Sequence, residues 1–198
     1  AVMDALEEEI RAMGVDEGQA ASKIHMDHLR EMASALGEYL EQSTQMDSCA
    51  GPSGNVQVEV PFDVPISSVH IRGRIDRMEL EGQGVRIIDF KTGKKGNKTG
   101  AKKDPDHPQL ALYQLAVEQL GYEVLGAELK YLGYGDVRTI SQDPLDPETK
   151  ADWISQLDEI GQKMKGPSFI ATPSDEACQY CEFARSCPAR EQGKRSVE

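Results

Sequence analysis

The hydrophobic positions of the first 46 residues repeat with the period of a helix. Apolar side chains recur at three- and four-residue spacing, at Leu29, Met32, Ala33, Leu36, Tyr39 and Leu40. Gly14 and Gly18 interrupt the pattern before this stretch. The sequence therefore predicts acidic, amphipathic helices within residues 1–46, separated by a break at the glycines.

The pattern changes to that of strands after a loop. The segment DSCAGPSGN, at residues 47–55, is rich in the residues that form loops. Beyond it, β-branched residues alternate or cluster, as they do in strands, in VQVEVPF, VHIRGRIDRMEL and VRIIDFKT. Gly82-Gln83-Gly84 supplies a tight turn between the second and third of these segments. We therefore expect a small antiparallel meander.

Helix and strand patterns alternate in the second half of the chain. Residues 93–108, GKKGNKTGAKKDPDHP, predict one long loop. Pro108 to Leu120 predicts a helix with proline in its first turn and apolar residues on one side. AELKYLGY predicts a further strand, and Asp146 to Met164 a last helix. This order of elements predicts an α/β or α+β fold.

The composition is that of a domain with one core. Hydrophobic residues make up 38% of the 198 residues, which favours one domain over two. Within it we expect a helical segment at residues 1–46, the main folded core at 47–175 and a cysteine-bearing tail at 176–198. There is no run of about eighteen apolar residues, and AVMDALEEEIRAMG lacks the regions of a secretory signal. We expect a cytoplasmic protein.

Charge is distributed unevenly along the chain. The formal net charge is -12, which by itself disfavours a nucleic-acid partner, because phosphate binding depends on lysine and arginine. Residues 70–110, however, hold ten basic and six acidic side chains. This basic island predicts a face that could steer a polyanion, although a solvated, lysine-rich loop explains the run of charge about as well.

Two acidic residues and a lysine form the sharpest chemical pattern. Asp76 lies thirteen residues before Asp89, and Lys91 follows Asp89 by two. Strand alternation sends residues i and i+2 to the same face, so Asp89 and Lys91 are expected to project together. Two carboxylates can hold a cation such as Mg²⁺, which activates water, while an ammonium stabilises developing negative charge. This combination predicts phosphodiester hydrolysis.

The context of these residues strengthens the prediction. A D-x-K pattern on a strand is usually a surface ion pair, but Asp89 follows an apolar run in which an unpaired carboxylate would be costly. Lys91 stands at a strand end, where ligand sites tend to collect. Gln109 and Tyr113 are four residues apart in the predicted helix after the loop and therefore share one helical face.

GRIDR, IDFKTG and HPQLALYQ, in this order and at these separations, resemble the nuclease domain of the RecB family within the PD-(D/E)XK superfamily. The tail CQYCEFARSCPAR looks like the cysteine triplet of its iron–sulfur members, including AddB and the actinobacterial AdnA and AdnB proteins. The resemblance covers roughly residues 56 to 193. It implies a restriction-endonuclease-like core, with a mixed central sheet flanked by helices, and a nuclease that acts on DNA.

The resemblance also assigns site residues. Asp76 and Asp89 match the carboxylates that bind Mg²⁺ or Mn²⁺, and Lys91 matches the motif lysine. Gln109 and Tyr113 match a Q-x-x-x-Y pair that lies beside the active site in the family. Glu59 aligns with an acidic residue often found before the GRID strand; it either helps the metal site or is an ordinary exposed strand carboxylate.

One family feature is missing from the pattern. Many RecB-like nucleases carry an early metal-binding histidine in a G-x-x-x-H context, and His25 and His28 have no matching glycine. We interpret both as helix surface, which makes the chain a domain that starts after this motif. Such a domain would have a depleted metal site and weakened or absent activity.

The cysteines near the C-terminus predict a bound metal. Cys178, Cys181 and Cys187 form C-x₂-C-x₅-C, a spacing that lets three thiolates reach one soft centre. Zinc is the generic expectation, and the family resemblance favours a four-iron, four-sulfur cluster instead. Cys49 is the only other thiol, and its surroundings do not match the family's first cysteine, so it is an unlikely fourth ligand.

Three functions remain open on the sequence alone. The leading one is a metal-dependent deoxyribonuclease acting on DNA ends or single strands, as the nuclease domain of a bacterial recombination and repair helicase–nuclease with a partner subunit. The second is a non-catalytic DNA-binding domain of the same fold. The third is a standalone exonuclease that resembles CRISPR-associated members. The presence of both aspartates and the lysine argues against the second.

Overall fold

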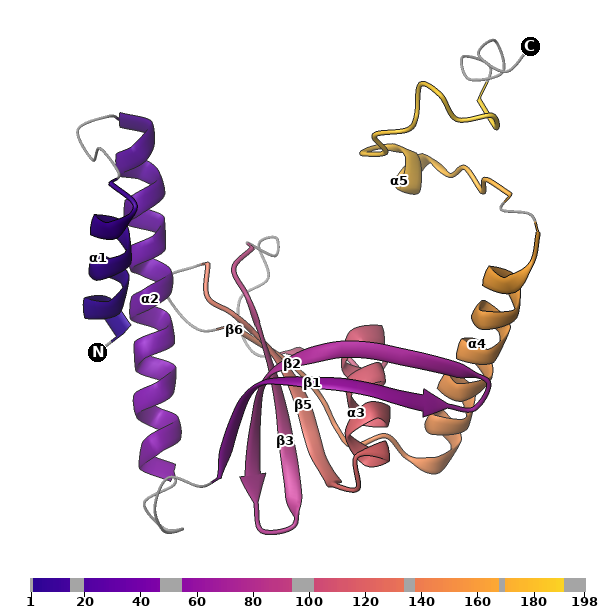
Figure 1. Cartoon of the computed structure of the whole chain (residues 1–198), viewed down its shortest axis with the longest axis horizontal. Coiled ribbons are helices and arrows are strands. Elements are labelled where there is room, and N and C mark those ends of the chain that lie inside the picture. The colour runs from indigo at the N-terminus through magenta and orange to yellow at the C-terminus, as the bar shows by residue number, and fades with distance from the viewer. Residues whose placement is uncertain are drawn as a thin grey trace. The chain divides into compact units, whose positions relative to one another are not determined.

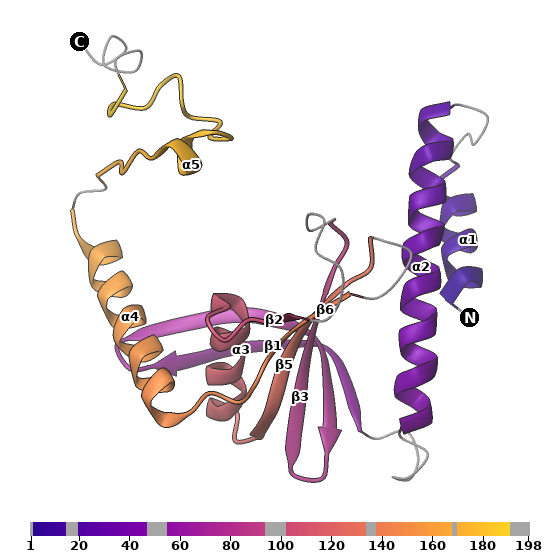
Figure 2. The ribbon, with the colours of Figure 1, turned by 180° about the vertical axis from the view of Figure 1, so that it is seen from behind.

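The fold is described from a computed structural model, which covers residues 2–14, 20–46, 55–93, 102–133, 138–167 and 170–190. The helices are α1 (Val2–Ala12), α2 (Ala20–Met46), α3 (Pro108–Gln119), α4 (Pro147–Lys165) and α5 (Asp175–Cys178). The strands are β1 (Val56–Ile66), β2 (Val69–Glu81), β3 (Gly84–Lys91), β4 (Lys102–Lys103), β5 (Glu123–Tyr131) and β6 (Arg138–Gln142). Figures 1 and 2 show these elements from opposite sides.

The strands form one mixed, six-stranded sheet in the order β1-β2-β3-β5-β6-β4. β1, β2 and β3 are the predicted antiparallel meander. β5 pairs with β3 in parallel, so the chain must cross over between them, and α3 makes that crossover. β5 and β6 are antiparallel, and β4 lies parallel to β6. The predicted α/β fold with a mixed sheet is confirmed.

An apolar core joins α3 to the strands of the sheet. Its fully buried members include Ile75 and Met78 from β2, Ile87 from β3 and Leu110 from α3. The proline at the first turn of α3 fits a position whose N–H has no partner within the helix. This packing fixes α3 against the strands that carry Asp76 and Asp89.

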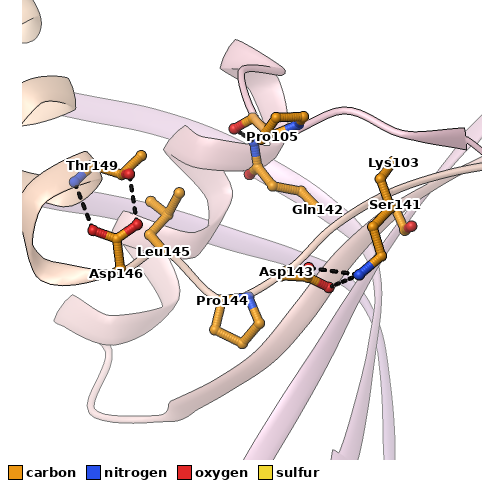
Figure 3. Close-up of a pocket in the computed structure, with 9 residues that line it drawn as sticks. All are labelled: Lys103, Pro105, Ser141, Gln142, Asp143, Pro144, Leu145, Asp146 and Thr149. Carbon is orange, nitrogen blue, oxygen red and sulfur yellow. Dashed lines mark hydrogen bonds and ion pairs between the residues drawn. The ribbon is translucent and has the colours of Figure 1, made fainter.

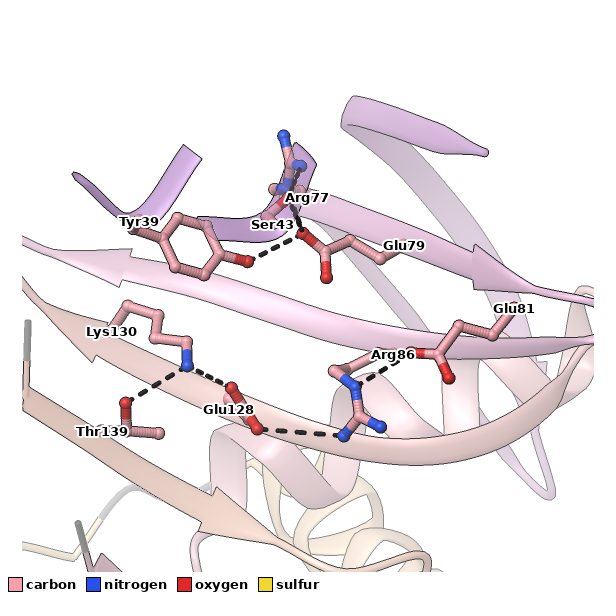
Figure 4. Close-up of polar contacts among 9 residues, drawn as sticks. All are labelled: Tyr39, Ser43, Arg77, Glu79, Glu81, Arg86, Glu128, Lys130 and Thr139. Carbon is pink, nitrogen blue, oxygen red and sulfur yellow. Dashed lines mark hydrogen bonds and ion pairs between the residues drawn. The ribbon is translucent and has the colours of Figure 1, made fainter. Parts of the chain in front are cut away.

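The opposite face of the sheet is polar and contacts α2 (Figure 4). Tyr39 of α2 donates a hydrogen bond to Glu79 over 2.8 Å, and Glu79 also accepts one from Arg77 over 2.7 Å. Further along the sheet, Glu128 pairs with Arg86 and Lys130. Because these charges satisfy one another, half-buried polar side chains are tolerated on this face.

The structure differs from the predicted elements at the far edge of the sheet. β6 was not predicted, because Arg138–Gln142 is short and carries little hydrophobic alternation. Lys102–Lys103, placed in the long loop by its composition, forms β4 beside β6. β5 begins at Glu123, four residues earlier than predicted. The bounds of these strands depend on hydrogen bonding between backbone groups, which leaves no pattern in the side chains.

The chain divides into two compact units, Ala1–Leu157 and Asp158–Glu198, with the boundary inside α4. The first unit holds the sheet, α1, α2 and α3, and the second holds Cys178, Cys181 and Cys187. No helix in the described ranges has the length and apolar character needed to cross a membrane.

Candidate active site

Asp89 and Lys91 project from the same face of β3, as strand alternation predicts. Asp89 is only 3% exposed, and its Oδ2 lies 2.6 Å from Nζ of Lys91. No hydrogen bond from the described residues reaches this buried Oδ2, so the ammonium is its electrostatic partner. Oδ2 of Asp89 is therefore an oxygen that a metal cation could contact in place of the Lys91 ammonium.

The other oxygen of Asp89 is held by α3. Gln109 donates to Oδ1 from Nε2 over 2.9 Å, and the hydroxyl of Tyr113 lies 3.2 Å from the same oxygen. Gln109 also donates to the Tyr113 hydroxyl over 3.0 Å. The Tyr113 hydroxyl lies 3.1 Å from the carbonyl oxygen of Arg74 as well. The two helix residues therefore fix the orientation of the Asp89 carboxylate.

Asp76 lies beside Asp89 across the β2–β3 hairpin. Arg77 pairs with Ile88, and the next step along this register brings the two aspartates opposite each other. Oδ2 of Asp76 accepts a hydrogen bond of 2.7 Å from the backbone N–H of Phe90. Burial raises the pKa of Asp76 above its ordinary value, and the charges of Asp89 and Glu59 raise it further. The hydrogen bond and Lys91 act in the opposite direction.

Glu59 lies opposite Asp76 on β1, because Val58 pairs with Arg77 and Val60 with Ile75. Its backbone has φ of 52°, a left-handed value that costs energy for a residue with a side chain. Its carboxylate is 62% exposed and lies 3.2 Å from a guanidinium nitrogen of Arg74. Glu59 is thus an exposed carboxylate at the margin of the aspartate pair.

Gly73, the glycine of GRID, makes room for an aromatic side chain. A Cβ on Gly73 would lie 2.4 Å from Cζ of Phe62. The Phe62 ring in turn meets the Tyr113 ring edge to face, with centroids 6.0 Å apart. Neither Phe62 nor Gly73 was predicted as a site residue. A glycine inside a strand, which often marks a close approach, was the available signal.

A buried amide pair, Gln142 and Gln114, fixes the start of α3, and Figure 3 shows Gln142 beside Pro105. Gln142 of β6 is 3% exposed and donates from Nε2 to the carbonyl oxygen of Pro105 over 2.8 Å. Its Oε1 accepts from Gln114 of α3 over 2.9 Å. Gln114 in turn accepts from the backbone of Leu145 over 3.0 Å. This pair was not predicted, because Gln114 and Gln142 are far apart in the sequence.

The aspartate pair suits a hard cation. Mg²⁺ in proteins is usually held by one or two carboxylates, with water and substrate phosphate completing the shell. Asp76 and Asp89 offer two carboxylates, and Oδ2 of Asp89 lacks a hydrogen bond from any described residue. Within the described ranges, however, no three histidine, cysteine or acidic side chains gather closely enough to hold a metal between them. The donor set therefore fits a two-carboxylate site.

The cysteines do not form such a group. Cys178, Cys181 and Cys187 are free thiols, and Cys181 is exposed. As described above, no three potential ligands converge in the described residues, and this includes the thiols. Cys49, the weak candidate for a fourth ligand, lies outside the described residues. The geometry gives no support for the expected iron–sulfur cluster.

The two early histidines lie on α2. His25 is exposed, and Nδ1 of His28 lies 3.8 Å from a carboxylate oxygen of Glu31 one turn away. Neither is among the residues that contact Asp76 or Asp89 through the hydrogen bonds described above.

The described part of the predicted basic island does not form one face, and Lys94, Lys95 and Lys98 lie outside the described residues. Arg72 and Arg74 are exposed on β2, whereas Arg77 and Arg86 lie on the polar face that contacts α2. Lys91 belongs to the aspartate pair. Basic residues that are close in sequence therefore project from different faces of the sheet, because successive strand residues point to opposite faces.

Comparison with protein families gives one match that covers most of the chain. The model of the PD-(D/E)XK nuclease superfamily matches residues 1–188. The chain belongs to the PD-(D/E)XK nuclease superfamily. The mixed sheet with its flanking helices is consistent with the restriction-endonuclease-like core of the superfamily.

Two relatives are the gene 69 proteins of the mycobacterium phages L5 and D29. The chain is 26% identical to the first over 152 residues, which are 74% of the chain and 49% of the phage protein. It is 24% identical to the second over 142 residues, 69% of the chain and 49% of the phage protein. This superfamily member thus spans about half the length of the curated relatives it matches, and their names state no activity.

Two solved structures are similar to this superfamily member. SSO0001 matches with a TM-score of 0.44 and 21% identity, over 78% of this chain and 69% of its own. A protein of Eubacterium rectale, whose given name suggests an exonuclease, matches with a TM-score of 0.45 and 13% identity, over 78% and 59%.

Proposed function

We propose that this chain is a divalent-metal-dependent deoxyribonuclease that hydrolyses phosphodiester bonds at DNA ends or in single strands. The observation that carries the proposal is the buried Asp89, whose two oxygens face Gln109 and Tyr113 on one side and Lys91 on the other. Burying a carboxylate is costly. The hydrogen bonds and the ion pair with Lys91 offset part of that cost and hold the carboxylate in one orientation.

Asp76 and Asp89 would hold Mg²⁺ or Mn²⁺. Such an ion supplies a Lewis acid for the phosphoryl oxygen and lowers the pKa of bound water. Gln109 and Tyr113 would keep the Asp89 carboxylate aimed at the ion, because their hydrogen bonds go to Oδ1 and leave Oδ2 without one from the described residues. Burial raises the pKa of Tyr113, which keeps its hydroxyl protonated and able to donate.

Lys91 would exchange its partner during the reaction. In the metal-free protein its ammonium neutralises Oδ2 of Asp89 over 2.6 Å. When a cation engages that oxygen, the ammonium becomes available to the phosphate, where it would orient the attacking water or stabilise developing negative charge. Its one-third exposed side chain has room to make this movement.

Glu59 would assist the site from its margin. Its charge is close enough to Asp76 to raise the pKa of that carboxyl. Arg74 holds Glu59 in an exposed ion pair, which is weak and readily broken. Released from Arg74, the Glu59 carboxylate could accept a hydrogen bond from a metal-bound water.

The biological setting is proposed from sequence motifs. The order of the GRID, D-x-K and Q-x-x-x-Y motifs, with the cysteine triplet, favours an exonuclease domain of a RecB-family helicase–nuclease. DNA is the substrate, and the parent helicase chain with a partner subunit would supply unwinding. A standalone exonuclease of the CRISPR-associated type shares these motifs and is the second candidate.

An iron–sulfur cluster at the cysteine triplet is proposed from the sequence, through the spacing of the thiols and the family resemblance. C-x₂-C-x₅-C brings three thiols together in sequence, and a cluster would fasten the tail rather than take part in hydrolysis. Anaerobically purified protein with an absorbance band near 400 nm, and about four irons per chain, would support this proposal. Colourless protein with stoichiometric zinc would contradict it.

The decisive experiment follows degradation of linear DNA, single- and double-stranded, in Mg²⁺, Mn²⁺ and Ca²⁺. Three variants each remove one functional group of the proposed centre: Asp76→Asn, Asp89→Asn and Lys91→Ala. Asp143→Asn is the matched control, because this carboxylate is 70% exposed and pairs with Lys103 away from the centre. Circular DNA and DNA with blocked ends separate exonuclease from endonuclease action.

Cleavage in Mg²⁺ or Mn²⁺ that is lost in the three variants and kept in Asp143→Asn would establish the enzyme. Equal cleavage by parent and variants would identify a contaminant. Retained DNA binding without cleavage by the parent chain would instead favour the non-catalytic, DNA-binding domain.

A further inference from the structure

The exposed face of the β1–β2 hairpin carries a row of basic side chains that leads to Asp76. His70, Arg72 and Arg74 are spaced two residues apart on β2, and Asp76 is the next residue of the same row. Their side chains are 66%, 78% and 64% exposed. We call His70, Arg72 and Arg74 the hairpin row.

Each member of the hairpin row is paired with an exposed acidic side chain on β1. Asp63 lies 2.8 Å from Arg72 and 3.2 Å from His70, and Glu59 lies 3.2 Å from Arg74. Exposed pairs of this kind contribute little to stability. An external anion can therefore replace the acidic partners, Asp63 and Glu59, with little loss of stability.

The spacing of the hairpin row suits a chain of phosphates. Alternate residues of an antiparallel strand lie about 6.8 Å apart, which is close to the separation of neighbouring phosphates on one nucleic-acid strand. Arginine guanidinium groups bind phosphate through two parallel hydrogen bonds, at a strength that a neutral donor does not reach. The row can thus follow a phosphate backbone toward the aspartates.

Other arginines of the same sequence region are less suited to this task. The side chains of Arg77 and Arg86 are 11% and 34% exposed, and they are held by Glu79 and Glu81 on the polar face that contacts α2. That face is opposite the one from which Asp89 projects. Among the described arginines of β2, the exposed ones are Arg72 and Arg74 of the hairpin row.

We propose that the hairpin row is a binding track for the sugar–phosphate backbone of the DNA strand that is cut, with Asp63 and Glu59 as competing internal anions. This inference rests on the proposed nuclease function, because it names the route by which that substrate reaches the centre. Arg74 binds the phosphate next to the scissile one, and Arg72 the phosphate beyond it. His70 extends the track beyond Arg72.

The test measures binding of a fluorescent single-stranded oligonucleotide in Ca²⁺, so that it does not depend on cleavage. The parent chain is compared with Arg72→Ala, with the double variant Arg72→Ala/Arg74→Ala, and with Lys163→Ala. Lys163 is a matched control, because it is 72% exposed and pairs with Glu159 on α4, as the arginines pair on the hairpin. Binding is measured at several salt concentrations.

Each arginine removed should weaken binding roughly three- to tenfold at low salt and lower the slope of log K against log salt by about 0.7. Lys163→Ala should change neither quantity. An unchanged slope in the double variant, with an unchanged far-ultraviolet circular dichroism spectrum, overturns the proposal. An equal loss in Lys163→Ala overturns it as well, because binding would then follow overall charge.

Asp63→Asn gives a test of opposite sign. Removing this anion frees both Arg72 and His70, so the variant should bind the oligonucleotide more tightly than the parent chain. If the ion pair is purely structural, the variant should not bind the oligonucleotide more tightly. Unchanged affinity in Asp63→Asn would therefore overturn the proposal that Asp63 competes with phosphate. Asp63→Asn also controls for folding, because a damaged hairpin would not bind more tightly.

Failure of the track and failure of the nuclease give different results. A parent chain that cleaves DNA but shows no loss in the arginine variants retains the nuclease and overturns the track. Binding that depends on the arginines, in a chain that cleaves nothing in Mg²⁺ or Mn²⁺, retains the track and removes the nuclease. If both hold, the arginine variants should raise KM for DNA more than they lower kcat.

Discussion

The backbone N–H of Phe90 donates to Oδ2 of Asp76 over 2.7 Å, which ties the aspartate of β2 to the D-x-K segment of β3. Phe90 stands between Asp89 and Lys91 in sequence, and its ring points to the opposite face of the sheet. There it meets the ring of Tyr39, with centroids 5.6 Å apart. One residue thus links the two carboxylates on one face to the packing of α2 on the other.

Asp76→Asn should make the metal-free protein more stable at neutral pH. Burial raises the pKa of Asp76 in the native state above its ordinary value of 3.8. At a pH between the unfolded-state pKa and the raised native-state pKa, the native state binds more protons than the unfolded chain. The free energy of unfolding therefore falls as pH rises through that range. Asparagine removes the charge and keeps an acceptor for Phe90. Thermal melts in EDTA should show a higher Tm for the variant at pH 7, and the difference should shrink below about pH 4.

The same melts test metal binding. Mn²⁺ should raise the Tm of the parent chain, because it binds the native state and relieves repulsion between the carboxylates. The variant should gain much less. An equal rise in both proteins would place the metal elsewhere.

Lys91→Ala should lower kcat and tighten metal binding. The ammonium lies 2.6 Å from Oδ2 of Asp89 and competes with a cation for that oxygen. Loss of one group that stabilises transition-state charge typically costs about 10²- to 10³-fold in kcat. Titration with Mn²⁺, followed by electron paramagnetic resonance, should give a smaller Kd for the variant. Weaker Mn²⁺ binding would show that Lys91 organises the site instead of competing for it.

Gln109→Leu and Tyr113→Phe should each weaken the site without unfolding it. Both residues contact Oδ1 of Asp89, and partners of metal ligands typically contribute about 10- to 100-fold to metal affinity or activity. Gln119→Ala, at an exposed position of the same helix, is the control. Variants with normal Mn²⁺ affinity and normal rates would show that Asp89 needs no support from α3.

Gly73→Ala should disturb the site through Phe62. The new Cβ would lie 2.4 Å from Cζ of the ring, so the ring must move away from Tyr113, at a cost of about 1–3 kcal/mol. Denaturant unfolding measures this loss. Phe62→Leu should cost less in the Gly73→Ala background than in the parent chain, and additive effects in this double-mutant cycle would rule out the contact.

Gln142→Leu should destabilise the native state by about 1–3 kcal/mol, because Gln114 and backbone carbonyl oxygens lose a buried partner. The variant should also lose activity, since the start of α3 carries Gln109. Gln83→Ala, at an exposed position of the β2–β3 turn, provides the comparison for urea unfolding. A variant as stable and as active as the parent chain would contradict a supporting function for Gln142.

The sequence by itself determined the relationships that depend on local geometry. Alternation along a strand puts Asp89 and Lys91 on one face, and the helical period does the same for Gln109 and Tyr113. The antiparallel pair of Asp76 and Asp89 was also within reach, because both lie equally far from the turn at Gly82 and Gln83. The meander and α3 follow from the same periodicities.

Only the tertiary structure decided the relationships between distant segments. The contact of α3 with Asp89, the close approach of Phe62 to Gly73 and the burial of Gln142 depend on how layers pack. Packing and strand register are set by contacts far apart in the chain, and local periodicity carries no record of them.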